Sequence, residues 1–268
     1  MQFGAQLKEW RTHRRLSQMD LANEAGISSR HVSFLETGRS RPTEGMILRL
    51  SSVLDIPLRA QAPLFSAAGF SPRFGGQKAP TLQSLPVPVA DAIRLILDRQ
   101  NPYPALAFDH EYTVLAVNDA LAVLGSAAGL PLGPGTNFLD LYLGSPTLRA
   151  IIVNWGKTAA DLVRRIRADI RLQGPRSPLS ARIEQLAAAP DIVSALETYP
   201  HGDGLPVLPV EMKLGEIELR WITTLTTFGS IQDALVEGVM IEQFFPADEP
   251  TRAYFEAGAS PAPNTSRA

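Results

Sequence analysis

Apolar side chains recur at helical spacing through residues 3–70, in several short segments rather than one long one. The next residues, 71–89, contain four prolines and two glycines and lack such a pattern. Because proline favours extended backbone in the residue before it, this stretch is expected to be a linker, with an ordered loop packed on one domain as the alternative. The pattern therefore predicts an all-α domain over residues 1–70.

Residues 90–250 are expected to form a second domain that mixes strands and helices. Strands are predicted at 104–109, 113–118, 207–214, 217–228 and 239–246, where β-branched and aromatic residues gather. Helices are expected at 88–99, 118–124, 137–142, 146–172 (broken near Gly156), 180–188 and 191–196. This order suits an α+β domain, with one antiparallel sheet and helices on one face. Residues 251–268 are expected to be a disordered tail.

The charges are distributed unevenly between these two parts. Residues 1–75 carry ten Lys or Arg against six Asp or Glu, whereas the remaining residues carry fifteen against twenty-one. A basic domain joined to a larger acidic one suggests a polyanionic partner for the first domain alone.

The chain contains no cysteine, which excludes disulfides, thiolate metal sites and a cysteine nucleophile. Its start, MQFGAQLKEW, lacks the basic residues and apolar run of a signal peptide. No apolar stretch reaches the roughly 18 residues that predict a transmembrane helix. A cytoplasmic location without membrane contact is therefore expected.

Residues 17–38 have the features of two short helices joined by a tight turn. A capping box at Ser17 is expected to start the first helix, and Gly26 permits the left-handed backbone that ends it. The second helix is expected from Ser28 to Thr37, with Val32 and Leu35 spaced to face the core. This is the helix-turn-helix arrangement, whose second helix normally lies in the major groove.

The run LSQMDLANEAGISSRHVSFLETGRSRPT, extended to about residues 4–69, resembles the phage-repressor-like (Xre) helix-turn-helix family of bacterial transcription regulators. The resemblance depends on residue types at fixed spacings: Gln18, Leu21, Ala22, Gly26, Leu35, Glu36, Gly38, Arg41 and Pro42. It implies a five-helix domain that binds double-stranded DNA. Such proteins usually bind as dimers on two half-sites about one helical turn apart, so a homodimer is expected.

The resemblance implies that three residues contact the phosphate backbone: Gln18, Arg39 and Arg41. Such contacts position a protein on DNA without reading its sequence. Glu36 is acidic and is instead expected to pair with Arg11 on the first helix, as in similar proteins, in a structural role.

The N-terminal part of the second helix is expected to face the base edges. Ser29, Arg30 and Ser33 would lie there, and Arg30 could bind guanine O6 and N7. Phe34 could touch a thymine methyl group or equally pack onto the domain, and His31 could contact DNA or stay solvated. The candidate DNA-binding residues are Gln18, Ser28, Ser29, Arg30, His31, Ser33, Phe34, Arg39 and Arg41.

The second domain shows no catalytic constellation. Its histidines, His110 and His201, have no partner at metal-ligand spacing, and there is no G-x-S-x-G elbow. The glycine-rich GPGT at 133–136 carries no phosphate-loop lysine and is interpreted as a turn. No enzymatic activity, catalytic residue, metal or cofactor is expected.

Three segments of this domain resemble the ligand-binding domain of MmyB-like transcription regulators, a PAS-like fold: PALAFDHEYTVLAVNDAL, IIVNW and TTLTTFGSIQDALVEGVMIEQFFPAD. The resemblance implies a small lipophilic ligand, for example a fatty acid, between the sheet and its helices. The candidate ligand-binding residues are Asn154, Trp155, Trp221, Thr223 and Phe228. As alternatives, Trp155 and Phe228 could be plain core, and Asn154 could only satisfy a backbone group.

These features favour a transcription regulator whose second domain responds to a small apolar ligand. Two alternatives stay open. The second domain could serve only dimerisation or protein interaction, or it could be an enzyme fused to a DNA-binding domain. The predicted helix at 146–172 and the terminal strands are candidate dimer surfaces.

Overall fold

The computed structural model describes residues 3–71, 81–174, 177–200, 207–229, 231 and 233–259. Where described, the chain divides into two compact units. The first combines residues 1–78 with 167–181 and 229–237, and the second contains the rest. The expected division into consecutive domains is thus incomplete, since two segments from the second half of the chain belong to the first unit.

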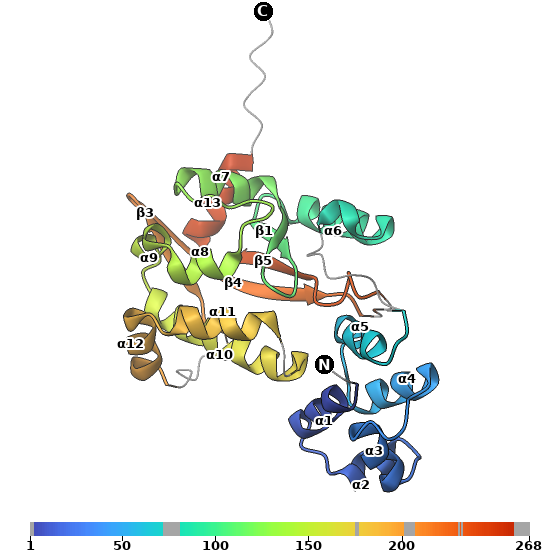
Figure 1. Cartoon of the computed structure of the whole chain (residues 1–268). Coiled ribbons are helices and arrows are strands. Elements are labelled where there is room, and N and C mark those ends of the chain that lie inside the picture. The colour runs from blue at the N-terminus through green and yellow to red at the C-terminus, as the bar shows by residue number, and fades with distance from the viewer. Residues whose placement is uncertain are drawn as a thin grey trace, which may run out of the picture. The chain divides into compact units, whose positions relative to one another are not determined.

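Five helices form most of the first unit, which confirms the predicted all-α domain (Figure 1). They are α1 (Phe3–His13), α2 (Gln18–Glu24), α3 (Ser29–Glu36), α4 (Glu44–Val53) and α5 (Leu58–Ala67). Ser17 forms the expected capping box with Asp20, and Ser28 accepts a hydrogen bond of 3.2 Å from the His31 amide. Gly26 has a φ of +62°, the left-handed backbone that takes the chain from α2 toward α3.

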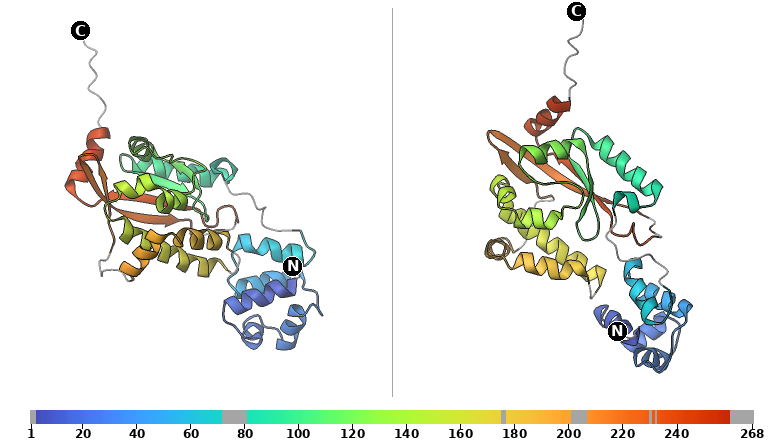
Figure 2. Two further views of the ribbon diagram at one scale, coloured as in Figure 1. Left: turned by 60° about the vertical axis from the view of Figure 1, so that its left-hand side comes forward. Right: turned by 45° about the horizontal axis from the view of Figure 1, so that its top comes forward.

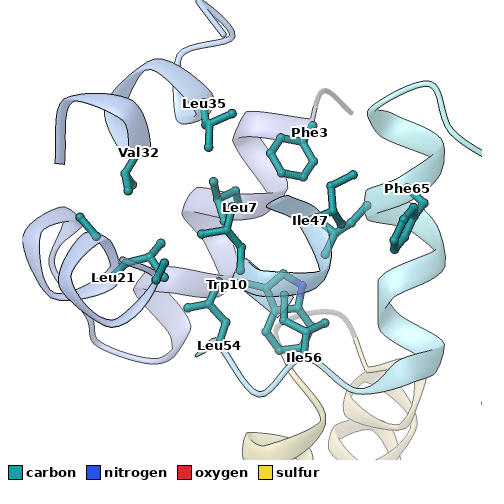
Figure 3. Packing of buried hydrophobic residues seen from close by; sticks show 14 residues of the cluster. Phe3, Leu7, Trp10, Leu21, Val32, Leu35, Ile47, Leu54, Ile56 and Phe65 are labelled. Carbon is teal, nitrogen blue, oxygen red and sulfur yellow. The ribbon is translucent and has the colours of Figure 1, made fainter. Parts of the chain in front are cut away.

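One apolar cluster joins the five helices, with the inward side chains of α1, α2 and α3 meeting those of α4 and α5 (Figure 3). Val32 and Leu35 of α3 are fully buried in it, as their spacing predicts. Gly4 allows α1 to approach α3 closely, because a Cβ atom there would lie 2.3 Å from the carbonyl oxygen of Glu36. The buried face of α3 thereby fixes the opposite face toward solvent.

Helix α5 receives its N-terminal cap from a residue far away in the sequence. Pro57 precedes the helix and supplies no side-chain cap. Instead, the Glu237 carboxylate accepts hydrogen bonds from the amides of Leu58 (2.9 Å) and Arg59 (3.1 Å). The Arg59 guanidinium also forms an ion pair of 3.2 Å with Glu237. This contact joins the segment 229–237 to the helical domain within the first unit.

The second unit contains one antiparallel sheet of five strands in the order β2-β1-β5-β4-β3. The strands are β1 (Ala105–Phe108), β2 (Val114–Val117), β3 (Val210–Leu214), β4 (Ile217–Thr227) and β5 (Met240–Pro246). The predicted α+β class and antiparallel sheet are therefore confirmed. The register pairs Leu106 with Glu242, so a central part of the sheet places a carboxylate among apolar neighbours.

Helices cover both faces of the sheet, whereas one covered face was expected. The remaining helices are the short 3₁₀ turn η1 (Leu82–Ser84), α6 (Val87–Gln100), α7 (Asp119–Ala127), α8 (Phe138–Gly144), α9 (Pro146–Ile151), α10 (Trp155–Gln173), α11 (Pro178–Ala187), α12 (Pro190–Thr198) and α13 (Glu249–Ala259). Within the second unit, α12 and the part of α10 up to Ile166 follow one face of the orange strands, and α6 lies on the other (Figure 2). All four residues of β1 are buried, so both faces of this strand need a cover.

The helix predicted over 146–172 is broken near Gly156, as expected, at residues 152–154. Residues between α9 and α10 interrupt it, because Ile152 forms a β-bridge with Met212. The Asn154 side chain also donates to the carbonyl of Pro209 (2.8 Å) and accepts from the amide of Glu211 (3.1 Å). Contacts with β3, and not helix propensity, therefore decide where the chain turns.

The predicted disordered tail contains the helix α13. Asp248 accepts a hydrogen bond of 2.9 Å from the amide of Thr251, which starts the helix. Phe255 is buried and meets the ring of Tyr103 edge to face, with centroids 6.2 Å apart. This tertiary contact explains the helix, and residues 260–268 lie outside the described part of the chain.

The predicted linker is ordered at its C-terminal end. Residues 81–89 contain η1 and the start of α6, and Leu82 and Leu85 are buried in the second unit. Residues 81–89 are therefore packed on one domain, which is the alternative that was considered for this stretch. Residues 72–80 lie outside the described residues.

Candidate DNA-binding face and ligand cavity

The candidate DNA-binding residues gather on the solvent face of α3 and in the turns beside it. Ser28, Ser29, Arg30, Arg39 and Arg41 are exposed, whereas the remaining four are half-buried: Gln18, His31, Ser33 and Phe34. The hydroxyl group of Ser28 caps α3, so it serves the helix itself. The face presents three cations, which suits a phosphate backbone.

The ring of Phe34 contacts two of these cations. The guanidinium groups of Arg30 and Arg39 lie 5.2 and 5.9 Å from its ring centroid. At a solvent-exposed site a cation beside an aromatic ring gains about 0.5–1 kcal/mol, which limits how freely the two arginine side chains move. The ring of Phe34 thereby keeps Arg30 of α3 and Arg39 of the following turn on the same side of the domain.

Glu36 connects the first three helices, which confirms its predicted pairing with Arg11. Its Oε1 lies 2.6 Å from Arg11 Nε, and its Oε2 accepts from Gln18 Nε2 at 2.7 Å. Arg11 also donates to the carbonyl of Leu16 at 2.7 Å. The Glu36 side chain is only 3% exposed. Gln18 therefore takes part in the scaffold through a contact that was not predicted from the sequence.

The second unit contains a cavity of about 140 Å³ between the sheet and its helices. This volume is close to the roughly 150 Å³ of an engineered apolar cavity that binds benzene. It lies below the roughly 300–1,000 Å³ of common ligand pockets. Most of the wall is apolar, with lining residues that include Leu106, Leu121, Leu124, Phe138, Leu141, Leu148, Leu162, Val210, Met212 and Phe244.

A few polar side chains interrupt this apolar wall. They are Tyr142, Thr158, Asp161, Arg165, Trp221, Thr223 and Glu242. The hydroxyl groups of Tyr142 and Thr158 satisfy each other at 2.7 Å, and burial raises the pKa of Tyr142. Glu242 is 5% exposed, and burial raises the pKa of its carboxyl, against the effect of Arg165 and Thr223. The cavity is therefore an apolar space with several polar and ionisable side chains in its wall.

The structure places two of the five candidate ligand-binding residues in the cavity wall, Trp221 and Thr223. Asn154 bonds the backbone of β3, which is the alternative role considered for it. Trp155 is buried, and its Nε1 donates to the carbonyl of Tyr142 at 2.9 Å. Phe228 is half-buried after the end of β4 and is not among the lining residues.

Glu242 and Arg165 are wall residues that were not predicted from the sequence. A signal for Glu242 exists, because it is a lone carboxylate inside the apolar run VMIEQFF. Alternation along β5 places it on the same face as Phe244. Arg165 has no comparable signal, since many arginines on an amphipathic helix face solvent.

Within the described part of the chain, no helix is both long and apolar enough to cross a membrane. Among the same residues there is no group of three His, Asp or Glu side chains that could hold a metal ion.

Comparison with known protein families covers both parts of the chain. The family model of the MmyB-like transcription regulator ligand binding domain matches residues 89–257. A helix-turn-helix domain model matches residues 2–64. No curated protein matches the chain significantly. The two matches agree in place and order with the helical domain and with the domain that holds the cavity.

Proposed function

Because the chain belongs to the family of MmyB-like transcription regulators, we propose that it is a DNA-binding regulator, and not an enzyme, that senses a small lipophilic ligand. The apolar cavity with a few polar side chains in its wall carries this proposal. Such a space suits a molecule with an apolar body and one polar head. The resemblance suggests a fatty acid or a similar lipid as the ligand. It also suggests that one face of the sheet borders the ligand cavity, as in a PAS-like fold.

The DNA-binding half of the proposal assigns α3 to the major groove. Arg30 is exposed near the start of the helix and would meet base edges together with Ser29 and Ser33. Arg39 and Arg41 are exposed after its end and would meet phosphates. Gln18 would contact phosphate from the start of α2, while its amide also holds Glu36.

One experiment tests both halves together. Duplexes that the purified chain prefers are selected from random DNA, and their affinity is measured with and without saturating medium-chain lipids. A sensor should change its DNA affinity about five-fold or more on ligand binding. Bound lipid with unchanged DNA affinity would contradict sensing, and failure to select any duplex would contradict the DNA-binding role.

We further propose that the regulator acts as a homodimer on DNA. A single helical domain of this size offers few phosphate contacts, and two half-sites would combine their affinities. Sedimentation at micromolar concentration should show a dimer, free or bound to its duplex. A chain that stays monomeric in both states would refute this proposal.

A further inference from the structure

Helix α10 borders the ligand cavity along one side. Its wall residues are Thr158, Asp161, Leu162 and Arg165. Residues at this spacing lie on the same side of a helix, so these four form one stripe that faces the cavity. A ligand in the cavity therefore packs against α10, and a ligand that needs more than about 140 Å³ has to displace part of the wall.

The same helix continues from the second unit into the first. Its residues up to Ile166 belong to the second unit, and those from Arg167 onward belong to the unit of the helical domain. Within that first unit, Nε2 of His13 lies 2.8 Å from the carbonyl oxygen of Arg171, which accepts the hydrogen bond. His13 is the last residue of α1, so the end of α10 is joined to the first helix of the helical domain.

A closer contact follows at Gly174, the residue directly after α10. Gly174 has a φ of +109°, a backbone conformation that residues with a side chain rarely adopt. A Cβ atom there would lie 1.9 Å from Cη2 of Trp10, so the chain passes this ring more closely than any other residue type allows. Trp10 is 7% exposed and belongs to the apolar cluster that joins the five helices (Figure 3). The end of α10 thus contacts the core of the helical domain.

Helix α1 also holds α3 in place. Arg11, next to Trp10, forms the ion pair of 2.6 Å with Glu36 at the end of α3. The close approach at Gly4 adds a second contact between these two helices. A displacement of α1 therefore moves α3, whose exposed face carries Arg30.

From these contacts we propose that α10 transmits occupancy of the cavity to the DNA-binding helices through the contact of Gly174 with Trp10. The inference rests on the proposed lipid-sensing function and names the regulation of that function. Packed contacts of this kind respond to helix shifts of about 1–2 Å. The competing route is the connection between β4 and β5, residues 229–237, which joins two strands of the wall to the first unit.

The test measures the coupling between lipid and DNA in the full chain. The affinity for a selected duplex is measured with and without saturating decanoate or decanol, and the affinity for that lipid with and without duplex. Because coupling between binding sites is reciprocal, the two ratios should be equal, at about five-fold or more in the unchanged chain. Gly174→Ala should reduce both ratios to about one, while the variant still binds lipid and duplex separately.

A second variant tests the same contact without a new clash. His13→Ala removes the hydrogen bond to Arg171 and should lower both ratios, by less than Gly174→Ala does. Gly215→Ala is the matched control, because Gly215 also has a positive φ, of +60°, but no atom lies within 4 Å of a Cβ there. This control should keep the ratios of the unchanged chain. Circular dichroism confirms that each variant is folded before its binding is compared.

The possible results separate this inference from the proposed function. Unchanged ratios in folded Gly174→Ala, or in His13→Ala where the first variant does not fold, would overturn the inference and leave lipid sensing intact. Loss of coupling in Glu237→Gln, together with its retention in Gly174→Ala, would assign the route to residues 229–237 instead. A DNA affinity that no saturated acid or alcohol from hexyl to dodecyl changes in the unchanged chain would overturn both proposals.

Discussion

Arg30 and Arg41 are two exposed cations for which we expect different contributions to DNA binding. Arg30→Ala should relax base preference at one position, a loss of about 1–3 kcal/mol on the preferred duplex only. Arg41→Ala should weaken binding to all sequences alike and reduce the salt slope by about 1. Anisotropy titrations with the preferred and single-substituted duplexes, at several salt concentrations, measure both effects.

The comparison uses Arg41 rather than Arg39 because Arg39 shares the ring of Phe34 with Arg30. Losing one of these two guanidinium groups could release the other. If Arg30→Ala weakens every duplex equally, Arg30 contacts phosphate and not bases.

Glu242 should make the unchanged protein less stable as the pH rises. Below its ordinary pKa of 4.5 the carboxyl is protonated in both the folded and the unfolded chain, and its burial costs little. Above 4.5 the unfolded chain releases this proton, whereas the folded chain keeps it up to a raised pKa. The folded state then binds more protons, so the free energy of unfolding falls with rising pH.

Urea unfolding of the unchanged chain and of Glu242→Gln across this range measures the effect. The variant should gain stability relative to the unchanged chain as the pH rises from about 4.5 toward neutrality. Asp109 is also buried with a raised pKa, but it is present in both proteins and cancels in the difference. A constant difference across the range would show that Glu242 titrates alike in both states.

The sequence could predict which candidate side chains share a face, but not which face borders a cavity. Trp221 and Thr223 were predicted from a resemblance and do line it. The role of Asn154 could not be predicted in this way, because its partners, at and just before the start of β3, lie 55 and 57 residues later in the chain. Predicting that Glu242 lines the cavity would require the register of β1, β4 and β5, and no local sequence pattern gives that register.

At the scale of elements, the close approach of α1 to α3 leads to a prediction about stability. Gly4→Ala should destabilise the helical domain by about 1–3 kcal/mol, because the new Cβ would lie 2.3 Å from the carbonyl oxygen of Glu36. Gly45→Ala is the matched control, since no atom lies within 4 Å of a Cβ there. In the helix α4 that change should stabilise by about 0.5–1 kcal/mol.

Thermal unfolding of both glycine variants gives the comparison. The midpoint should fall for Gly4→Ala and stay the same or rise for Gly45→Ala. Equal midpoints would mean that α1 can move away from α3 without loss of packing.

The boundaries of elements were predictable where the determinants are local. Ser17, Ser28 and Asn118 each cap a helix by binding an amide three residues later, a spacing visible in the sequence. The break before α10 and the helix α13 depend on contacts with distant strands and with Tyr103. The pattern of apolar residues within those two segments does not indicate these distant contacts.

At the scale of the molecule, the sequence predicted the two folds and their order along the chain. It did not predict that segments from the second half of the chain belong to the first unit. Residues 229–237 lie in the second half of the chain, and their contacts place them with the helical domain. A carboxylate near the unpaired amides at the start of a helix stabilises that helix. The position of Glu237 in the sequence does not indicate which helix it caps.

Glu237→Gln should therefore weaken α5, although α5 is more than 150 residues away in the sequence. Loss of the capping charge and of the pair with Arg59 should cost about 0.5–2 kcal/mol of local stability. Hydrogen exchange should show reduced protection of the α5 amides. Asp91→Asn is the control, because the Asp91 side chain on α6 is 61% exposed and pairs with Arg94 of the same helix. Unchanged protection in α5 would contradict a capping role for Glu237.

The origin of this cap has a consequence for recombination. Leu58 and Arg59 lie within the segment that matches the helix-turn-helix family, and Glu237 lies within the segment that matches the ligand-binding family. A chimaera that joins residues 2–64 to a different sensor would lose the glutamate that starts its last helix. We therefore expect the two segments to be inherited as a pair, and a successful graft to carry a replacement acid at the start of α5.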